Sequence, residues 1–402
     1  MQLNNIKIYD EKALINDLAA NHGRSYQQCS MSVMDTISDP LVTFDEQGVS
    51  NYYAAYKRLE KKHVLTGKEG EDQLETVLSA IKKAGKGKQY DCITGISGGV
   101  DSTYLALMIK KWGLRPLVVH FDNGWNSELA VKNIENIVSR LNFDLYTLVV
   151  DWNEFRDLQL AYLKASVVDI EAITDHAILA TMYKLALKND IKYILSGTNV
   201  VTEAILPSYW IYPKADHVNI RSIHKKFGTI PLKTYPFFST KLKKQAAMKG
   251  ITSVSPLNYI PYNKAEVKEV IKKELEWRDY GGKHYESVFT RFYQGYILPA
   301  KFSIDKRKAH LSTLIFSGQI TKQEALESLK EPIYDQKTFE GDYEFVLKKL
   351  GLSHSDFQDY INQPRREHRE FGFEASLFQR YPILRPFKPF IRTFQRLNNA
   401  QK

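Results

Sequence analysis

Short apolar runs alternate with longer amphipathic segments in the middle of the chain. The runs have the length of strands, and the segments between them repeat hydrophobic residues every three or four positions, as helices do. The predicted strands are 90–96, 117–121, 145–150 and one around 193–195, and the predicted helices are 103–112, 127–141, 153–164 and 172–188. This alternation predicts an α/β domain built from right-handed βαβ units. Its parallel sheet should bind ligands at the carboxyl ends of the strands.

The pattern changes on both sides of this region. Before it, we expect a short weak helix in 1–24, turns around strand-like runs at 41–44 and near Val49, and a helix over 68–84 that ends at Gly85. After residue 239 we expect no further strand. The helices expected there are 239–249, 263–275, 284–296, 304–316, 321–330, 340–350 and 354–362. The sequence therefore predicts four parts: an N-terminal segment 1–84, the α/β domain 85–238, a mostly helical region 239–363 and a tail 364–402.

Composition limits the classes of protein to consider. The chain has 402 residues, of which 43% are hydrophobic and 25% charged, so it is long enough for several globular parts and unlike a fibre or a disordered chain. Its two cysteines, Cys29 and Cys92, cannot build a disulfide framework. No apolar run approaches the roughly 18 residues of a membrane span, and the polar first 24 residues do not have the pattern of a secretory signal. We therefore expect a cytoplasmic protein without a transmembrane segment.

The positive charge is concentrated near the end of the sequence. Residues 364–402 hold nine Lys/Arg and three Asp/Glu, a net of +6 out of +10 for the whole chain. Because the predicted domains carry little of the basic excess, the sequence argues against a nucleic-acid partner. The tail also contains seven aromatic residues. It either packs on its own chain with its charges in water, or docks onto a partner protein or an anionic membrane surface.

One segment between the first predicted strand and helix indicates chemistry: Ser97-Gly98-Gly99-Val100-Asp101-Ser102. Paired glycines let backbone N–H groups approach an anion, and the N-terminus of the following helix attracts the same charge. Ser97 and Ser102 add hydroxyl donors. Asp101 would repel a bare phosphate, so we expect a hard cation such as Mg²⁺ beside it. The segment is not a Walker-A loop, because it lacks the Gly-Lys-Ser/Thr ending.

This segment resembles the SGGxDS signature of the PP-loop (N-type) ATP pyrophosphatases, which have an adenine nucleotide alpha hydrolase-like fold. The resemblance implies that ATP is split between its α and β phosphates and that an oxygen of the substrate is adenylated. It makes Ser97, Asp101 and Ser102 the catalytic candidates, and the whole segment the phosphate-binding loop.

Two later segments fit the same resemblance. His120 and Asp122 end the second predicted strand, where PP-loop enzymes hold adenine and ribose, and Asp122 could instead only form the turn before Asn-Gly. Gly197 and Thr198 follow the fourth strand and are expected near the phosphates. Glu203 either shares the cation with Asp101 or is a solvated loop carboxylate.

Further segments are similar to the N-acetyl sugar amidotransferase family of bacterial surface-polysaccharide clusters. The similarity covers roughly residues 28–330. Its segments are 33–36, 43–49, 174–177, 197–203, 223–228, 278–287, 301–302 and 305–310. The family often begins with a CxxC…CxxC zinc knuckle, whose positions here are Cys29, Ser32, Ser50 and Tyr53. One thiol cannot hold a structural zinc ion, so we expect none.

The resemblance implies a complete reaction. The acetamido group of a nucleotide-linked sugar, with UDP as the expected nucleotide, is adenylated by ATP with Mg²⁺. Ammonia then displaces AMP to leave an acetamidino group, for O-antigen or related lipopolysaccharide synthesis. The chain has Gln2 where a glutaminase of the Ntn type needs cysteine, so we expect a separate glutaminase as the partner that supplies ammonia.

Five side chains are candidates for substrate binding: His176, Lys283, His284, Lys306 and Arg307. The lysines and the arginine suit phosphate or an acidic sugar, or else belong to a solvated helix face. The histidines could orient the amide or the ammonia, or be structural. Two other functions remain open, a PP-loop ligase that modifies RNA and a non-catalytic ATP-binding relative.

Overall fold

Five parallel strands form one sheet in this computed structural model, which describes residues 14–15, 23–281 and 285–375. The sheet order is β3-β2-β1-β4-β5. The strands are β1 (Cys92–Gly95), β2 (Pro116–Asp122), β3 (Asp144–Val149), β4 (Tyr193–Leu195) and β5 (Thr252–Val254). The order reverses at β1, and such a switch point opens a crevice at the carboxyl ends of the strands. The predicted α/β fold with a parallel sheet is confirmed.

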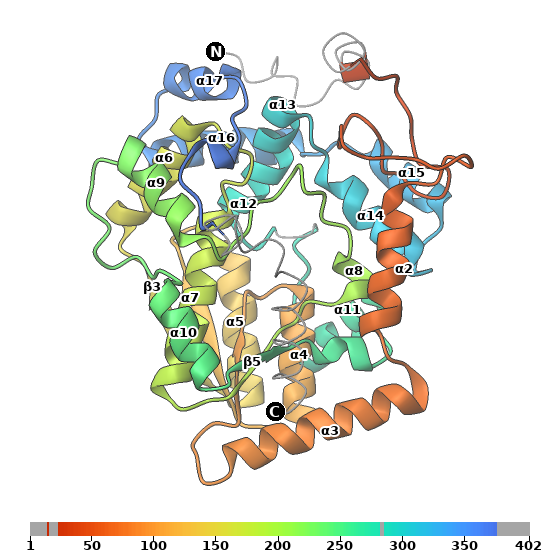
Figure 1. Ribbon diagram of the computed structural model, residues 1–402, viewed down its shortest axis with the longest axis vertical. Helices are drawn as coiled ribbons and strands as arrows, with labels where there is room; N and C mark the ends of the chain where they lie inside the picture. Colours follow the sequence, from red (N-terminus) through yellow and green to blue (C-terminus); the bar gives the residue numbers. More distant parts are fainter. Residues whose placement is uncertain (1–13, 16–22, 282–284, 376–402) are drawn as a thin grey trace, which may run out of the picture.

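Helices cover both faces of the sheet (Figure 1). One face is covered by α4 (Val100–Lys111), α5 (Glu128–Leu141) and α11 (Lys264–Leu275), and the other by α7 (Ala172–Lys188). Neighbouring residues of β1 explain this, because side chains of a strand alternate between faces. Cys92 packs against α4, whereas Ile93 packs against α7. Since both faces are covered, Cys92, Ile93 and Thr94 are all buried.

The remaining helices lie on either side of β5 in the sequence. Those before it are α2 (Asn51–His63), α3 (Gly67–Gly85), α6 (Trp152–Ala165), α8 (Val200–Glu203), α9 (His217–Phe227) and α10 (Thr240–Met248). Of these, α6 and α9 lie beside the C-terminal helices in Figure 1. The C-terminal helices are α12 (Val288–Phe292), α13 (Leu298–Phe302), α14 (Lys306–Phe316), α15 (Lys322–Lys330), α16 (Gln336–Leu350) and α17 (His354–Asn362). A π-helical turn, Tyr293–Ile297, joins α12 to α13. Aromatic side chains of this turn and its neighbours, among them Phe292, Tyr296 and Phe339, build a second core.

The structure differs from the sequence prediction at several places, including α9 (His217–Phe227), a helix that the sequence prediction omitted. β5 lies beyond residue 239, where no strand was expected, because it has three residues and two of them are exposed and polar. α2 was missed because Tyr56 alone is buried on it, so it has almost no apolar stripe. The strand-like runs at 41–44 and near Val49 contribute only a single bridge, Phe44 to Ser50. The helix expected in 1–24 lies outside the described residues except for 14–15.

The first part of the basic tail packs on the molecule's own surface. The Arg366 N–H donates to the Ser166 carbonyl at 3.0 Å, and the Gly372 N–H donates to Ser222 Oγ at 2.8 Å. Asn219 Nδ2 donates to the His368 carbonyl at 2.8 Å. Packing is therefore the correct alternative for 364–375, and 376–402 lie outside the described residues.

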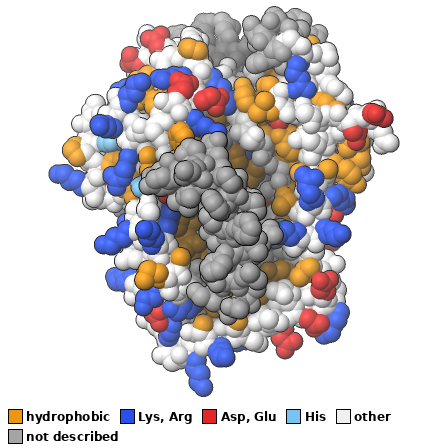
Figure 2. Space-filling view, viewed as in Figure 1, with side chains coloured by type: hydrophobic (Ala, Val, Ile, Leu, Met, Phe, Trp, Pro, Cys, Tyr) orange, Lys and Arg blue, Asp and Glu red, His pale blue; other side chains and the backbone are white. Residues whose placement is uncertain are grey.

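Basic side chains do not gather in one patch on the face shown in Figure 2. Lys and Arg side chains are scattered over both flanks, with hydrophobic side chains between them.

Within the residues that the structure describes, none of the helices is both long and apolar enough to cross a membrane.

Candidate active site

The glycine-rich segment forms a tight loop between β1 and α4. Gly98 has a φ of +81°, a conformation that favours glycine. Ser97 Oγ accepts from the Gly99 N–H at 3.2 Å, and Ser102 Oγ donates to the Gly99 carbonyl at 3.1 Å. Trp277 Nε1 donates to the Gly98 carbonyl at 2.7 Å from the other side. The loop is thus held open at the N-terminus of α4, as an anion site requires.

The loop after β4 lies directly against this helix N-terminus. A Cβ on Gly197 would lie 3.1 Å from the Asp101 carbonyl and from the Ser102 nitrogen. Thr198 Oγ1 is 2.9 Å from Ser196 Oγ and 3.0 Å from Ser255 Oγ, in a chain of hydroxyl groups. The structure therefore brings together the two segments that the sequence assigned to phosphates.

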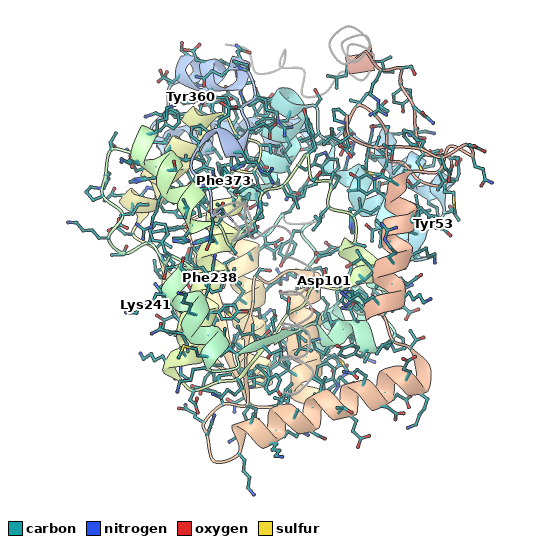
Figure 3. The ribbon with its side chains drawn as sticks, in the orientation of Figure 1. Tyr53, Asp101, Phe238, Lys241, Tyr360 and Phe373 are labelled. Carbon is teal, nitrogen blue, oxygen red and sulfur yellow. The ribbon has the colours of Figure 1, made fainter. Side chains whose placement is uncertain are left out.

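A cavity of about 310 Å³, here the loop cavity, lies between these two loops. Its lining residues include Ser97, Gly99, Asp101, Ser102, Gly197, Thr198, Glu203, Lys264, Lys268 and His310. Asp101 Oδ1 accepts from Asn199 Nδ2 at 3.2 Å and from the Tyr262 hydroxyl, so its carboxylate is fixed in the cavity. Figure 3 shows Asp101 beside the ribbons of α4 and α8.

The donor set of the loop cavity fits Mg²⁺ better than a transition metal. Asp101 and Glu203 both line the cavity, and Mg²⁺ in nucleotide sites takes one or two carboxylates together with phosphate oxygens and water. The described residues contain no group of three or more His, Cys, Asp or Glu arranged around one point. A cation here would therefore need the ligand's own oxygens.

A second cavity of about 340 Å³, the strand cavity, lies at the carboxyl ends of β1 and β2. It shares Ser97, Ser102 and Glu286 with the loop cavity. His120 lines it, with Nδ1 3.1 Å from the Ile96 carbonyl and Nε2 3.0 Å from Asn126 Nδ2. Asp122 is not among its lining residues. Its carboxylate accepts from the Gly124 N–H at 2.8 Å, which is the turn-forming role.

Glu171 is a lining residue that the sequence reasoning missed. It belongs to the strand cavity, beside the 174–177 segment, and accepts from Thr290 Oγ1 at 2.7 Å. Burial raises the pKa of Glu171 to about 7; nearby Asp175 adds to this, and the Thr290 hydroxyl opposes it. A carboxyl group in this cavity can therefore exchange a proton near neutral pH.

The third and largest cavity, about 820 Å³, lies among α2, α8 and α14 and is called the helical cavity. It shares Thr198, Glu203 and His310 with the loop cavity. Lys306 and Arg307, two of the candidates for substrate binding, line it. Arg307 is partly engaged already, since its Nη2 lies 2.8 Å from Asp305 Oδ2 and its Nη1 donates to the Glu331 carbonyl at 2.8 Å.

His176 does not lie in any of these three cavities, which corrects its assignment to substrate binding. It is fully buried, with Nδ1 2.6 Å from the Lys214 carbonyl, while Nε2 accepts from the Phe238 N–H at 2.9 Å. Burial lowers the pKa of His176 to about 4. The neutral ring therefore ties two backbone segments together. Lys283 and His284 lie outside the described residues.

The four positions that match the zinc knuckle, Cys29, Ser32, Ser50 and Tyr53, include only one thiol. Cys29 is buried, and its Sγ accepts from the Ser50 N–H at 3.2 Å. Burial raises the pKa of the Cys29 thiol, and hydrogen bonds from Ser32 and Ser50 outweigh it, so the pKa lies below its ordinary value. Cys92 is a buried residue of β1 in an apolar cluster.

Comparison with known proteins relates the C-terminal part of the chain to a family. Residues 286–385 match the family described as LPS biosynthesis protein WbpG-like, C-terminal domain. An uncharacterised protein of Methanocaldococcus jannaschii, MJ1599, is 24% identical over 290 residues, 70% of this chain and 84% of that protein. The tRNA(Ile)-lysidine synthase of Chlamydia pneumoniae is 35% identical over 71 residues, which are 17% of this chain and 22% of the synthase.

Two solved structures align with low scores. The NMN synthetase of Francisella tularensis has 12% identity and a TM-score of 0.35, covering 71% of this chain and 98% of its own. The NH3-dependent NAD synthetase of Campylobacter jejuni has 13% identity and a TM-score of 0.28, covering 65% and 97%. The family match begins at residue 286, in the wall that the strand and loop cavities share.

Proposed function

We propose, from the match of residues 286–385 to the WbpG-like C-terminal domain family, that the chain is an ATP-dependent, AMP-forming amidotransferase of lipopolysaccharide synthesis. Its substrate is a nucleotide-linked sugar, with UDP as the expected nucleotide. The enzyme converts an acetamido group of the sugar into an acetamidino group. AMP and pyrophosphate are the other products.

One observation carries the proposal: the three cavities lie in a row, and each shares lining residues with the next. The strand cavity shares walls with the loop cavity, which shares walls with the helical cavity. Adenosine at the carboxyl ends of β1 and β2 would leave the phosphates at the SGGVDS loop. An acceptor in the helical cavity would then approach the phosphates past Thr198 and Glu203. Two substrates that exchange an adenylyl group need this arrangement.

The residues of the loop cavity supply the electrostatic part of the reaction. The amide oxygen of the sugar attacks the α-phosphorus of ATP, and pyrophosphate leaves. The N–H groups of the loop and the N-terminus of α4 would stabilise the negative charge that develops there. Mg²⁺, held by Asp101 and Glu203, would offset charge on the phosphates. Adenylation is needed because an unmodified amide oxygen is a poor leaving group.

Ammonia completes the reaction, and we propose that a separate glutaminase supplies it. Both cysteines, Cys29 and Cys92, are buried and lie outside the three cavities. The isolated chain should therefore use ammonium chloride and not glutamine. Glutamine-dependent turnover by the isolated chain would disprove this part of the proposal.

The decisive assay measures amidine formation and AMP release with ATP, Mg²⁺, ammonium chloride and a panel of UDP-acetamido sugars. AMP formation that depends on one of these sugars supports the proposal. The short match to a tRNA(Ile)-lysidine synthase makes RNA the control substrate. AMP formation that depends on RNA and not on any sugar would contradict the proposal and favour an RNA ligase. ATP binding without turnover on either would favour a non-catalytic relative.

A further inference from the structure

Two side chains from distant parts of the sequence meet where the loop cavity joins the helical cavity. Lys264 is the first residue of α11 and lines the loop cavity, and His310 lies on α14 and lines both cavities. Lys264 Nζ is 2.9 Å from His310 Nε2. Under the proposed function, this junction is where the acceptor amide and the α-phosphate meet.

Two contacts of the imidazole indicate which ring nitrogen carries the proton. His310 Nδ1 lies 3.3 Å from the Thr202 carbonyl, which can only accept, so Nδ1 carries the proton. The Lys264 ammonium can only donate, so Nε2 offers its lone pair. His310 is therefore a neutral imidazole with its basic nitrogen at the cavity junction. Glu203 lines both cavities with His310, and Lys264 approaches the ring from the loop cavity.

We propose that His310 is the general base of the amination step and that Lys264 is the residue that keeps its Nε2 available. The inference rests on the proposed function, because it names the residue that handles the proton of the ammonia nucleophile. Lys264 would also interact with the phosphates of ATP. Its ammonium lies in the loop cavity, where anionic phosphates would attract it away from the imidazole and leave Nε2 free for the nucleophile.

The step balances as follows. The nitrogen lone pair of ammonia attacks the carbon of the protonated, adenylated imidate and forms a C–N bond, and the C=N π pair moves onto the sugar nitrogen. A tetrahedral centre that bears –NH3⁺ results, and the same pair re-forms the C=N bond when AMP leaves. His310 Nε2 accepts one proton from this nitrogen. The C–O bond to AMP then breaks, and its electron pair leaves with the AMP phosphate oxygen. The product is the acetamidine, and the imidazolium returns its proton to solvent.

The test separates the two half-reactions in His310→Gln. Exchange of labelled pyrophosphate into ATP, with sugar and without ammonia, reports adenylation, and amidine formation reports the whole reaction. We expect H310Q to keep exchange within a few-fold of wild type and to lose amidine turnover by on the order of 10²-fold or more. Hydroxylamine should restore part of the H310Q rate, because its adduct loses a proton more readily than the ammonia adduct.

The matched control is His354→Gln, since His354 lies on α17, has a 42% exposed side chain and lines none of the three cavities. H354Q should behave as wild type in both assays. Lys264→Met should slow pyrophosphate exchange as well as amidine formation, in contrast to H310Q.

Two results overturn the inference alone: amidine turnover by H310Q near the wild-type rate, or equal loss of exchange and turnover without rescue by hydroxylamine. Wild-type enzyme that forms amidine from none of the sugars would overturn the proposed function, and the inference with it.

Discussion

The same residue type plays opposite roles at two places in this molecule. His176 is buried and both ring nitrogens serve backbone groups, whereas His310 stands at a cavity junction with its basic nitrogen beside an ammonium. The sequence could not separate them, because the setting of each ring depends on elements far away in the chain. For His176 the partners are Lys214 and Phe238.

The buried imidazole predicts a pH dependence of stability. The pKa of His176 is lowered to about 4, so below the ordinary value near 6.5 the unfolded chain binds a proton that the folded chain does not. Stability from this residue is complete above about pH 6.5 and is lost as the pH falls toward 4. His176→Gln keeps a donor and an acceptor but cannot be protonated. Between pH 7.5 and 5, urea unfolding should show wild type losing about 2 kcal/mol more than H176Q. Equal losses of unfolding free energy in wild type and H176Q would contradict the prediction. His63→Gln, at an exposed histidine at the end of α2, is the control and should respond to pH as wild type does.

Asp101 carries the second residue-scale prediction. Asp101→Asn preserves the volume and can still contact Asn199 and Tyr262, but it removes the charge that a cation beside the phosphates requires. We expect AMP and pyrophosphate formation to fall by at least on the order of 10²-fold, with thermal unfolding nearly unchanged. Asp144→Asn, on the exposed start of β3, is the control and should remain active. Near-wild-type activity of D101N would refute the assignment of the loop.

At the scale of elements, the site depends on how closely two loops approach. The turn after β1 and the turn after β4 meet because β1 and β4 are neighbours in the sheet, although about 100 residues separate them. Gly197 makes the approach possible. Its missing side chain leaves room for the backbone of Asp101 and Ser102, the first turn of α4.

Gly197→Ala should therefore disturb the site through the backbone. The added Cβ would lie 3.1 Å from backbone atoms that cannot rotate away, so we expect a loss of about 1–3 kcal/mol in unfolding free energy and weaker ATP binding. The matched control is Gly341→Ala in α16, where a Cβ meets no atom within 4 Å. That substitution should stabilise the protein by about 0.5–1 kcal/mol. The prediction fails if both variants unfold alike and bind ATP alike, as measured by calorimetry.

At the scale of the whole molecule, the N-terminal turns are held by contacts with the C-terminal helices. Lys322 Nζ donates to the Cys29 carbonyl at 2.8 Å, and the Val33 N–H donates to Ser312 Oγ at 3.2 Å. Asp35 forms a buried ion pair with Lys308 of α14. The helices of the family-matched part thus give the degenerate knuckle the support that a metal ion would give elsewhere.

Elemental analysis of the purified protein should accordingly find no stoichiometric zinc. The positions that would need thiolates are Ser32, Ser50 and Tyr53, and a single cysteine cannot complete a tetrahedral site. Treatment with a zinc chelator should leave the melting temperature unchanged. One zinc ion per chain, or melting at a lower temperature after chelation, would refute this prediction.

The parts of the fold that were predicted correctly are those whose signals are local. The loop after β1 could be found because a short buried strand, two glycines and a mostly apolar helix follow one another directly. β5 could not, because its three residues become a strand only by pairing with β4. Lys264 and His310 could not be paired from sequence, since their contact depends on how α11 and α14 pack. The sequence marks the 305–310 segment as part of the family resemblance, but within it only Lys306 and Arg307 are candidates for substrate binding.

The shared walls of the three cavities also bear on inhibition. A single molecule that joins an adenosine phosphate mimic to an acetamido sugar would occupy the whole row, and its two halves would reach their sites in one encounter. Such a bisubstrate compound gains affinity over either half without any new contact, provided that its linker matches the passage beside Thr198 and Glu203. The length of the linker that gives the highest affinity would then measure the distance between the two bound substrates in solution.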